Sequence, residues 1–203
     1  LLVADEVAVG WGRTGTLFAV EREAVRPDLL ALAKGITGGY LPLAVTLATE
    51  AVYQRFLAPP EEGKTFFHGH TYTGNPLAAR AALAGLEVME KDRTLEALQG
   101  KIHHLKNGLK GFRGLAHVGD VRQCGFLAGI ELVEDRESKR PFPPGDRIAM
   151  RVAMEARRHG LIVRPLGDVL VIMPPFIVTT EEIDRLLELL FHCIPKITES
   201  RAS

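Results

Sequence analysis

Residues 1–15 read LLVADEVAVGWGRTG, and residues 29–39 read LLALAKGITGG. Both stretches begin with a short apolar run, reach a charged residue and continue into a glycine-rich loop. Apolar runs of this length are typical of parallel strands buried on both faces. Because ligands bind at the carboxyl ends of strands in open α/β sheets, Asp5 and Lys34 are expected to meet in one site at that edge. The same pattern also fits a surface ion pair, or Asp5 as a cap.

The residues after this pair predict more strands and helices, and the sequence pattern then changes. Asn75 followed by Pro76 is a strong helix start, because asparagine is a good N-cap and proline suits the first helical position. A domain boundary is predicted near residues 91–93, where the pattern changes. The elements predicted before it are a strand over 43–48, a helix over 50–57 and a helix over 76–90.

An α+β module is predicted after the boundary. Thr179 with Glu182 forms a capping box, which marks the start of the last helix. The predicted elements, in chain order, are a helix over 94–112, a strand over 126–133, a helix over 146–159 capped by Asp146 and terminated by Gly160, a hairpin of 161–166 with 169–173, and a last helix ending near Pro195.

Composition limits the classes of function. The chain has 203 residues with 25 basic and 25 acidic side chains, a net charge of zero, so no bulk charge favours nucleic acid or an acidic membrane. Cys124 and Cys193 form no disulfide framework or metal cluster, and both are expected to be small core residues. No apolar run approaches the ~20 residues of a membrane span, and no signal peptide is apparent. A soluble, cytoplasmic protein is expected.

The charged pair and its loops resemble the class III aminotransferases. In that family an Asp-Glu-Val or Asp-Glu-Ile run precedes a Gly-aromatic-Gly-Arg-Thr-Gly loop, as residues 5–7 and 10–15 do here. The family's lysine follows a proline-aspartate pair and an apolar strand, as Lys34 follows residues 27–33. The resemblance implies that pyridoxal 5'-phosphate (PLP) is the cofactor. It makes Lys34 the residue that bonds covalently to the PLP aldehyde, and Asp5 the carboxylate that keeps the pyridine nitrogen protonated.

The resemblance also implies an α/β fold, type I of the PLP-dependent transferases. Residues 1–93 would be the C-terminal part of the PLP-binding large domain, with its mostly parallel sheet. Residues 94–203 would be the small α+β domain. The chain opens inside a strand and without methionine, which suggests a fragment. On that expectation the family's preceding half, with further phosphate and ring contacts, is absent, and the fragment alone would be inactive.

Two further stretches narrow the resemblance to the biotin-pathway branch of the family. They are FFHGHTYTGNP at 66–76 and RPLGD at 164–168. The resemblance makes Thr71 a ligand of the PLP phosphate of the partner subunit in a homodimer, with His70 beside it in the phosphate loop. Gly69 would lie where the keto substrate approaches, and Arg164 would grip the substrate carboxylate with its planar fork.

The activity implied is transamination of 7-keto-8-aminopelargonate to 7,8-diaminononanoate, with S-adenosylmethionine or lysine as amino donor. Two alternatives stay open at this point. One is a class III enzyme for an ω-amino acid such as ornithine or 4-aminobutyrate, and the other is a truncated module that only dimerises. His68 and His70 lack a third ligand nearby, so zinc is not expected. Loop 10–15 lacks the spacing of a nucleotide fingerprint, and Trp11 within it is expected only to pack.

Overall fold

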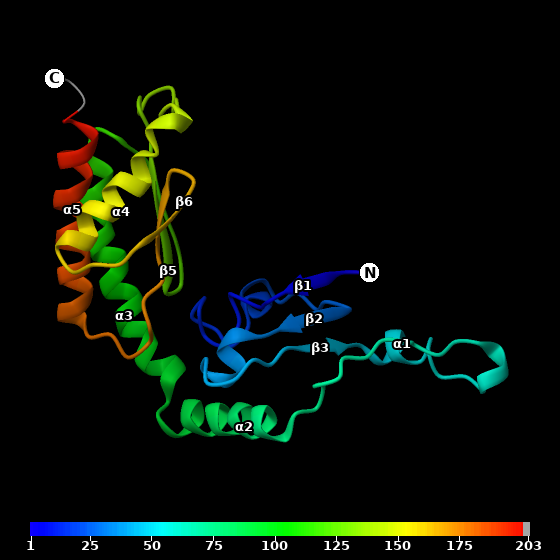
Figure 1. The fold of residues 1–203 in the computed structure, drawn as a ribbon. Helices are drawn as coiled ribbons and strands as arrows, with labels where there is room; N and C mark the ends of the chain where they lie inside the picture. The colour runs from blue at the N-terminus through cyan, green and yellow to red at the C-terminus, as the bar shows by residue number, and fades with distance from the viewer. Residues whose placement is uncertain (201–203) are drawn as a thin grey trace. The chain divides into compact units, whose positions relative to one another are not determined.

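The computed structural model describes residues 1–200, and its contacts divide the chain into two compact units. The first unit is Leu1–Leu95 and the second is Glu96–Ser203. Figure 1 shows the elements of both. Within the described residues, no helix has the length and apolar character needed to cross a membrane.

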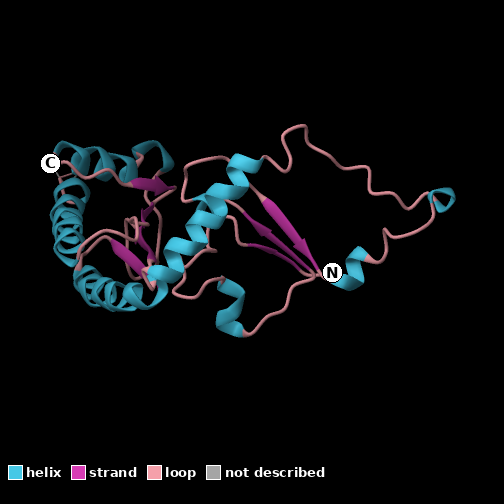
Figure 2. Cartoon of the chain, turned by 90° about the horizontal axis from the view of Figure 1, so that it is seen from below, coloured by secondary structure: helices cyan, strands magenta, loops and turns pink. Residues whose placement is uncertain are grey.

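The first unit is built on a three-stranded sheet (Figure 2). Strand β1 (Val3–Asp5) pairs in parallel with β2 (Leu29–Leu32), which pairs antiparallel with β3 (Val45–Ala48). The three strands lie where the sequence predicts them. The prediction that the first is buried on both faces is wrong, because Val3 is 60% exposed. Asp5 is also exposed and Ala4 is only half-buried, so neither face of β1 is buried.

Short helices and one long helix complete the first unit. Asn75 caps the long helix as predicted, because its Oδ1 accepts hydrogen bonds from the backbone N–H groups of Leu77 (3.0 Å) and Ala78 (3.4 Å). The predicted helix over 50–57 stops earlier, at Tyr53. The helices are η1 (Ala19–Glu23), η2 (Lys34–Thr37), α1 (Glu50–Tyr53), η3 (Pro60–Glu62) and α2 (Pro76–Lys91).

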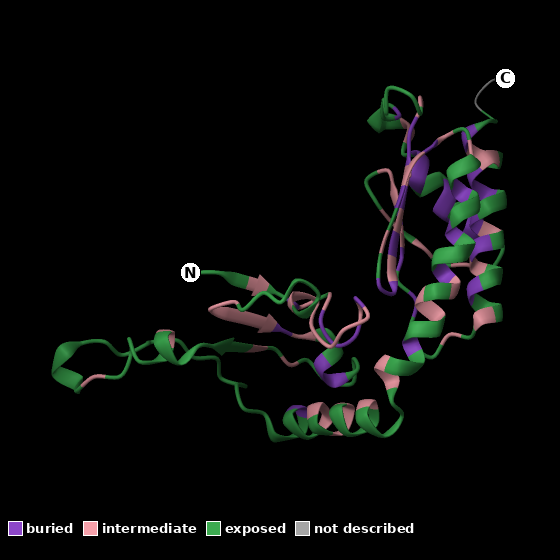
Figure 3. Cartoon of the chain, turned by 180° about the vertical axis from the view of Figure 1, so that it is seen from behind, coloured by how far each residue is buried: buried purple, intermediate pink, exposed green. Residues whose placement is uncertain are grey.

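The second unit packs helices on a four-stranded antiparallel sheet. Its strand order is β4-β5-β7-β6, and its core is the main concentration of buried residues in Figure 3. The predicted hairpin is confirmed as β6 with β7, whereas β4 was not predicted. The strands are β4 (Val118–Cys124), β5 (Leu127–Leu132), β6 (Arg164–Leu166) and β7 (Val169–Ile172), and the helices are α3 (Thr94–Gly108), η4 (Leu109–Gly114), η5 (Pro144–Asp146), α4 (Ile148–Arg158) and α5 (Thr180–Thr198).

Three local predictions in the second unit are wrong. Asp146 does not occupy the N-cap position of α4, because it ends η5 and the N-cap residue is Arg147, whose φ of 46° turns the chain. Pro195 lies inside α5, which continues because the Pro195 carbonyl still accepts the N–H of Glu199 at 2.9 Å. Cys124 is exposed at the end of β4, whereas Cys193 is buried as expected.

Candidate active site

Asp5 and Lys34 leave the sheet from the carboxyl ends of adjacent parallel strands. Asp5 is in register with Ala31 of β2, and the next N–H, that of Glu6, donates to the Ala31 carbonyl at 2.9 Å. Lys34 begins η2 directly after β2. Both side chains are exposed. The parallel pairing therefore brings the amine and the carboxylate to one edge of the sheet, as expected from the sequence.

The two side chains are not joined to each other. Among the described residues no hydrogen bond or ion pair links Asp5 with Lys34, so the alternative of a surface ion pair is not realised. Asp5 Oδ1 instead accepts the backbone N–H of Val7 at 3.0 Å. That bond fixes one carboxylate oxygen in the turn after β1. Both charged groups are therefore available to a ligand at this edge.

Lys34 occupies an unusual backbone conformation. Its φ is 47°, in the left-handed region that residues with a Cβ rarely adopt, and such a conformation costs about 1–3 kcal/mol. The turn is closed by the N–H of Ile36, which donates to the Ala33 carbonyl at 3.2 Å, and Ile36 itself is 7% exposed. A buried neighbour and a closed turn thus hold the lysine at the start of η2.

Glu6 organises the glycine-rich loop, a role that the sequence alone did not indicate. Its side chain is 1% exposed, and its two oxygens accept the N–H groups of Ala19 (2.9 Å) and Val20 (2.8 Å), at the start of η1. A carboxylate is favourable at such donors because it satisfies N–H groups that have no partner within the helix. The signal for it was the alternation along β1, which turns Glu6 away from the face of Asp5.

The loop itself folds on its own backbone. The Gly12 N–H donates to the Leu17 carbonyl at 3.1 Å, and the Arg22 guanidinium donates to the Thr14 carbonyl at 2.8 Å. Thr14 is buried, and burial lowers the pKa of Arg13 from its ordinary value. The loop is therefore a packed structure beside the edge that carries Asp5 and Lys34.

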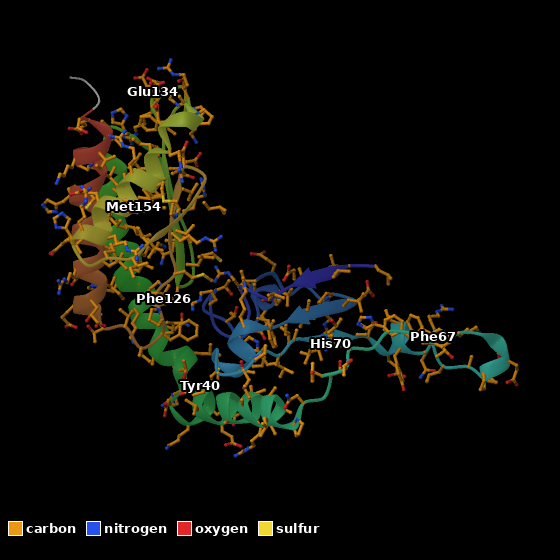
Figure 4. The ribbon with its side chains drawn as sticks, in the orientation of Figure 1. Tyr40, Phe67, His70, Phe126, Glu134 and Met154 are labelled. Carbon is orange, nitrogen blue, oxygen red and sulfur yellow. The ribbon has the colours of Figure 1, made fainter. Side chains whose placement is uncertain are left out.

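Gly69, His70 and Thr71 lie in the exposed segment that precedes α2. In Figure 4, His70 and Phe67 are labelled on this segment. The His70 carbonyl accepts the N–H of Thr73 at 2.9 Å, which makes a turn. A Cβ added to Gly69 would find open space. Within residues 1–200, no hydrogen bond or ion pair joins these three residues to Asp5 or Lys34.

Arg164 belongs to the second unit. It begins β6 opposite Val171 of β7, and its side chain is exposed. The hairpin turn beyond it contains Asp168, whose pKa is raised from its ordinary value by burial.

In the described part of the chain, no three His, Cys, Asp or Glu side chains gather as metal ligands.

The chain is similar to aminotransferases over nearly all of its length. Residues 1–194 match the family "Aminotransferase class-III". The adenosylmethionine-8-amino-7-oxononanoate aminotransferase of Geobacter sulfurreducens is 56% identical, over 98% of this chain and 44% of its own length. The enzyme of that name from Aquifex aeolicus is 54% identical, over 97% of this chain and 44% of its own. The chain therefore spans less than half of these relatives.

Solved structures agree with the sequence comparison. The crystal structure of adenosylmethionine-8-amino-7-oxononanoate aminotransferase from Methanocaldococcus jannaschii superposes with a TM-score of 0.93 at 46% identity, covering 96% of this chain and 45% of that one. A PMP-bound aminotransferase from Vibrio fluvialis gives 0.93 at 29% identity, covering 98% and 44%. The predicted α/β fold is thereby confirmed. The chain belongs to the class III aminotransferase family.

Proposed function

We propose that the protein is a PLP-dependent aminotransferase that converts 7-keto-8-aminopelargonate to 7,8-diaminononanoate in biotin biosynthesis. The observation that carries the proposal is Lys34, an exposed amine beside the Asp5 carboxylate at the carboxyl edge of a parallel strand pair. The names of the relatives from Geobacter and Aquifex support the substrate. Those names also favour S-adenosylmethionine over lysine as the amino donor. The proposed cellular location of the protein is the cytoplasm.

The donor set at this edge fits PLP. An aldehyde needs a primary amine that no carboxylate already holds, and within the described residues Lys34 makes no ion pair. A protonated pyridine nitrogen needs a carboxylate with a free oxygen, and the one bond given for Asp5 occupies only its Oδ1. When bound, PLP supplies an aldehyde that takes up amino groups and a ring that accepts electrons.

Three residues of this chain have separate roles in the proposed reaction. Lys34 Nζ would hold the cofactor aldehyde and, when free, would carry a proton to and from the reacting carbon of the substrate. Asp5 keeps a positive charge on the ring nitrogen and so stabilises charge that develops in the transition state. Arg164 binds the carboxylate of the keto acid with two parallel N–H donors.

The remaining predicted residues serve a homodimer in this proposal. Thr71 would donate to the phosphate of the partner's cofactor, His70 would contribute its backbone beside it, and Gly69 would leave room for the keto substrate. The exposure of the segment supports this role. Phe67 is 92% exposed and Tyr72 is 77% exposed, and aromatic side chains left this open are typical of surfaces that a partner covers.

Covalent labelling of the complete gene product tests the proposal. The protein is incubated with PLP, reduced with borohydride and mapped by mass spectrometry. We expect the pyridoxyl group on Lys34, its loss in Lys34→Met, and its retention in Lys91→Ala, which removes another exposed lysine of the same unit. A label on a different lysine would contradict the assignment.

Spectral change on adding single donors then separates the alternatives. S-adenosylmethionine should convert the bound cofactor to its amine form, and 7-keto-8-aminopelargonate should reverse the change. Conversion by ornithine or 4-aminobutyrate instead would identify an ω-amino acid aminotransferase. A dimer that takes up no PLP would identify a module without catalytic activity.

A further inference from the structure

Trp11 packs directly on the residue that follows Lys34. A Cβ atom added to Gly35 would lie 2.8 Å from Trp11 Cβ and 3.0 Å from its Cγ and Cδ1. Atoms never approach a Cβ at 2.8 Å without displacement, so the indole and this peptide are in contact. Trp11 is 8% exposed, and its ring also contacts that of Phe18, with centroids 5.7 Å apart in an edge-to-face arrangement.

Lys34 needs such support because its own conformation is unfavourable. The left-handed φ of 47° persists only when surrounding structure enforces it. Trp11, Leu32 and Ile36 form the buried core of this unit, so the turn at Lys34 is flanked on both sides in sequence by residues of one cluster. Helix α2 also packs on this turn, since a Cβ added to Gly85 would lie 3.5 Å from the Ile36 carbonyl oxygen. The turn thus contacts both the Trp11 loop and α2.

We propose that Trp11 is a positioning residue for Lys34: its ring presses on Gly35, enforces the left-handed turn and thereby aims the lysine amine. The inference rests on the proposed function, since it assigns a means of positioning to the same amine. It gives the aromatic residue of the glycine-rich loop a role beyond packing.

The shape of the ring, and not its N–H group, carries this role. Within the described residues the buried Trp11 Nε1 has no hydrogen-bond partner. The three atoms that meet Gly35 are Cβ, Cγ and Cδ1, and phenylalanine has all three. Trp11 itself has φ 60°. Phenylalanine and alanine also carry a Cβ, so the backbone cost at this position stays the same and only the ring changes.

The test measures the reactivity of Lys34 in the complete gene product. The rate at which PLP becomes bonded to Lys34 is followed by borohydride trapping and mass spectrometry, and in the cofactor-free protein the pH profile of Lys34 acetylation is compared with that of Lys91. Trp11→Ala should slow trapping by roughly tenfold to a hundredfold, because a small misplacement of a reacting group has effects of that size. Trp11→Phe should trap at the wild-type rate.

A matched control separates positioning from general loosening of the core. Met89 packs against the same cluster from α2, so Met89→Ala should lower the melting temperature while leaving the trapping rate unchanged. Gly35→Ala alters the same contact with Trp11 by changing Gly35 instead of the ring. The φ of Gly35 is not in the left-handed region, so its cost comes from collision with Trp11, and trapping should slow here too.

The outcomes distinguish the two proposals. Trapping at the wild-type rate in folded Trp11→Ala overturns the positioning role, as does equal slowing in Met89→Ala. If Trp11→Ala does not fold, Gly35→Ala decides, and a wild-type rate there overturns it. A wild-type protein that takes no label at Lys34 instead contradicts the proposed function itself.

Discussion

At the scale of the residue, Asp5 tests whether a single charge is needed. Asp5→Asn keeps the oxygen that accepts the Val7 N–H at 3.0 Å, so the turn should survive. The charge beside the ring nitrogen is lost, and turnover should fall by roughly 10²–10³-fold, as when a preorganised electrostatic contact is removed. Turnover and melting temperature are to be measured on the complete gene product.

Asp28→Asn is the matched control for that experiment. Asp28 also accepts a backbone N–H, that of Leu2 at 2.7 Å, and it stands immediately before β2, at the amino end of that strand. We expect little change in its turnover. Equal losses in the two variants would mean that Asp5 acts only through the fold.

Arg164 is the second residue that can be tested singly. Its side chain is exposed at the start of β6, so Arg164→Ala should leave the fold intact. Losing a carboxylate clamp should weaken the half-reaction with the keto acid by about 2–5 kcal/mol, and the half-reaction with the amino donor by less. Single-turnover kinetics of each half-reaction measure this. Arg151→Ala, which removes another exposed arginine of the same unit, is the control, and equal losses in both half-reactions would argue for a structural arginine.

The sequence predicted which residues lie at the edge of the sheet, but it did not predict the environment of each one. Asp5 and Lys34 each end an apolar run, and that is a local signal. The strand alternation turns Glu6 away from the face of Asp5, but its hydrogen-bond donors are the N–H groups of residues 19 and 20, and no local pattern reports that those residues fold back onto it. The left-handed backbone of Lys34 is enforced by Trp11, which is distant in sequence.

At the scale of the element, Glu155 joins two helices of the second unit. It lies on α4, its side chain is 5% exposed, and it contacts Lys196 of α5 at 2.6 Å. Arg158 (2.9 Å) and His159 (3.1 Å) bind the same carboxylate from α4. The hydrogen bond from Lys196, followed by that from His159, lowers the pKa of Glu155 from its ordinary 4.5 to about 2. The ionised form is therefore favoured by folding.

The sign of this shift predicts the pH dependence. A lowered pKa contributes stability that is fully present above about pH 4.5 and is lost as the pH falls through about 2. Glu155→Gln should therefore be less stable than the wild type near neutral pH, and the difference should shrink as acid is added. Trp11 and all three tyrosines belong to the first unit, so intrinsic fluorescence would not report on unfolding of the second unit. Hydrogen exchange of the α4 amides is therefore the measurement to use.

Glu134→Gln is the control for that titration. Glu134 is 37% exposed and pairs with the exposed Arg140, and such pairs contribute little. A difference from wild type that stays constant between pH 5 and 2 in Glu155→Gln would contradict the proposed linkage.

Helix ends were predictable where the cap is a local side chain. Asn75 and the Thr179–Glu182 box act within three residues of their own helix, so the sequence alone reports them. Asp146 failed because Arg147 adopts a left-handed turn that separates it from α4. Strand β4 was missed because its polar residues are satisfied across the sheet, as when Arg122 pairs with Glu131 of β5.

At the scale of the whole chain, the two units differ in how much core each possesses. The large buried cluster runs from Leu98 to Ile194 and lies entirely in the second unit. The cluster of the first unit has only Trp11, Leu32 and Ile36 as buried members. Ordering a backbone costs about 1–2 kcal/mol per residue, so burial on the scale of the first unit is insufficient by itself, whereas a domain of about 100 residues with its own core can fold.

Residues 94–203 expressed alone should therefore unfold cooperatively, and residues 1–93 alone should not. Far-UV circular dichroism during urea titration measures both, and Phe126→Ala supplies the control. Phe126 is fully buried, so truncating it in the 94–203 polypeptide should cost about 3–5 kcal/mol. If Phe126→Ala costs nothing, the core does not hold that polypeptide together. A cooperative transition in residues 1–93 would contradict the argument from core size, because the small cluster around Trp11, Leu32 and Ile36 would then have offset the backbone entropy of the unit.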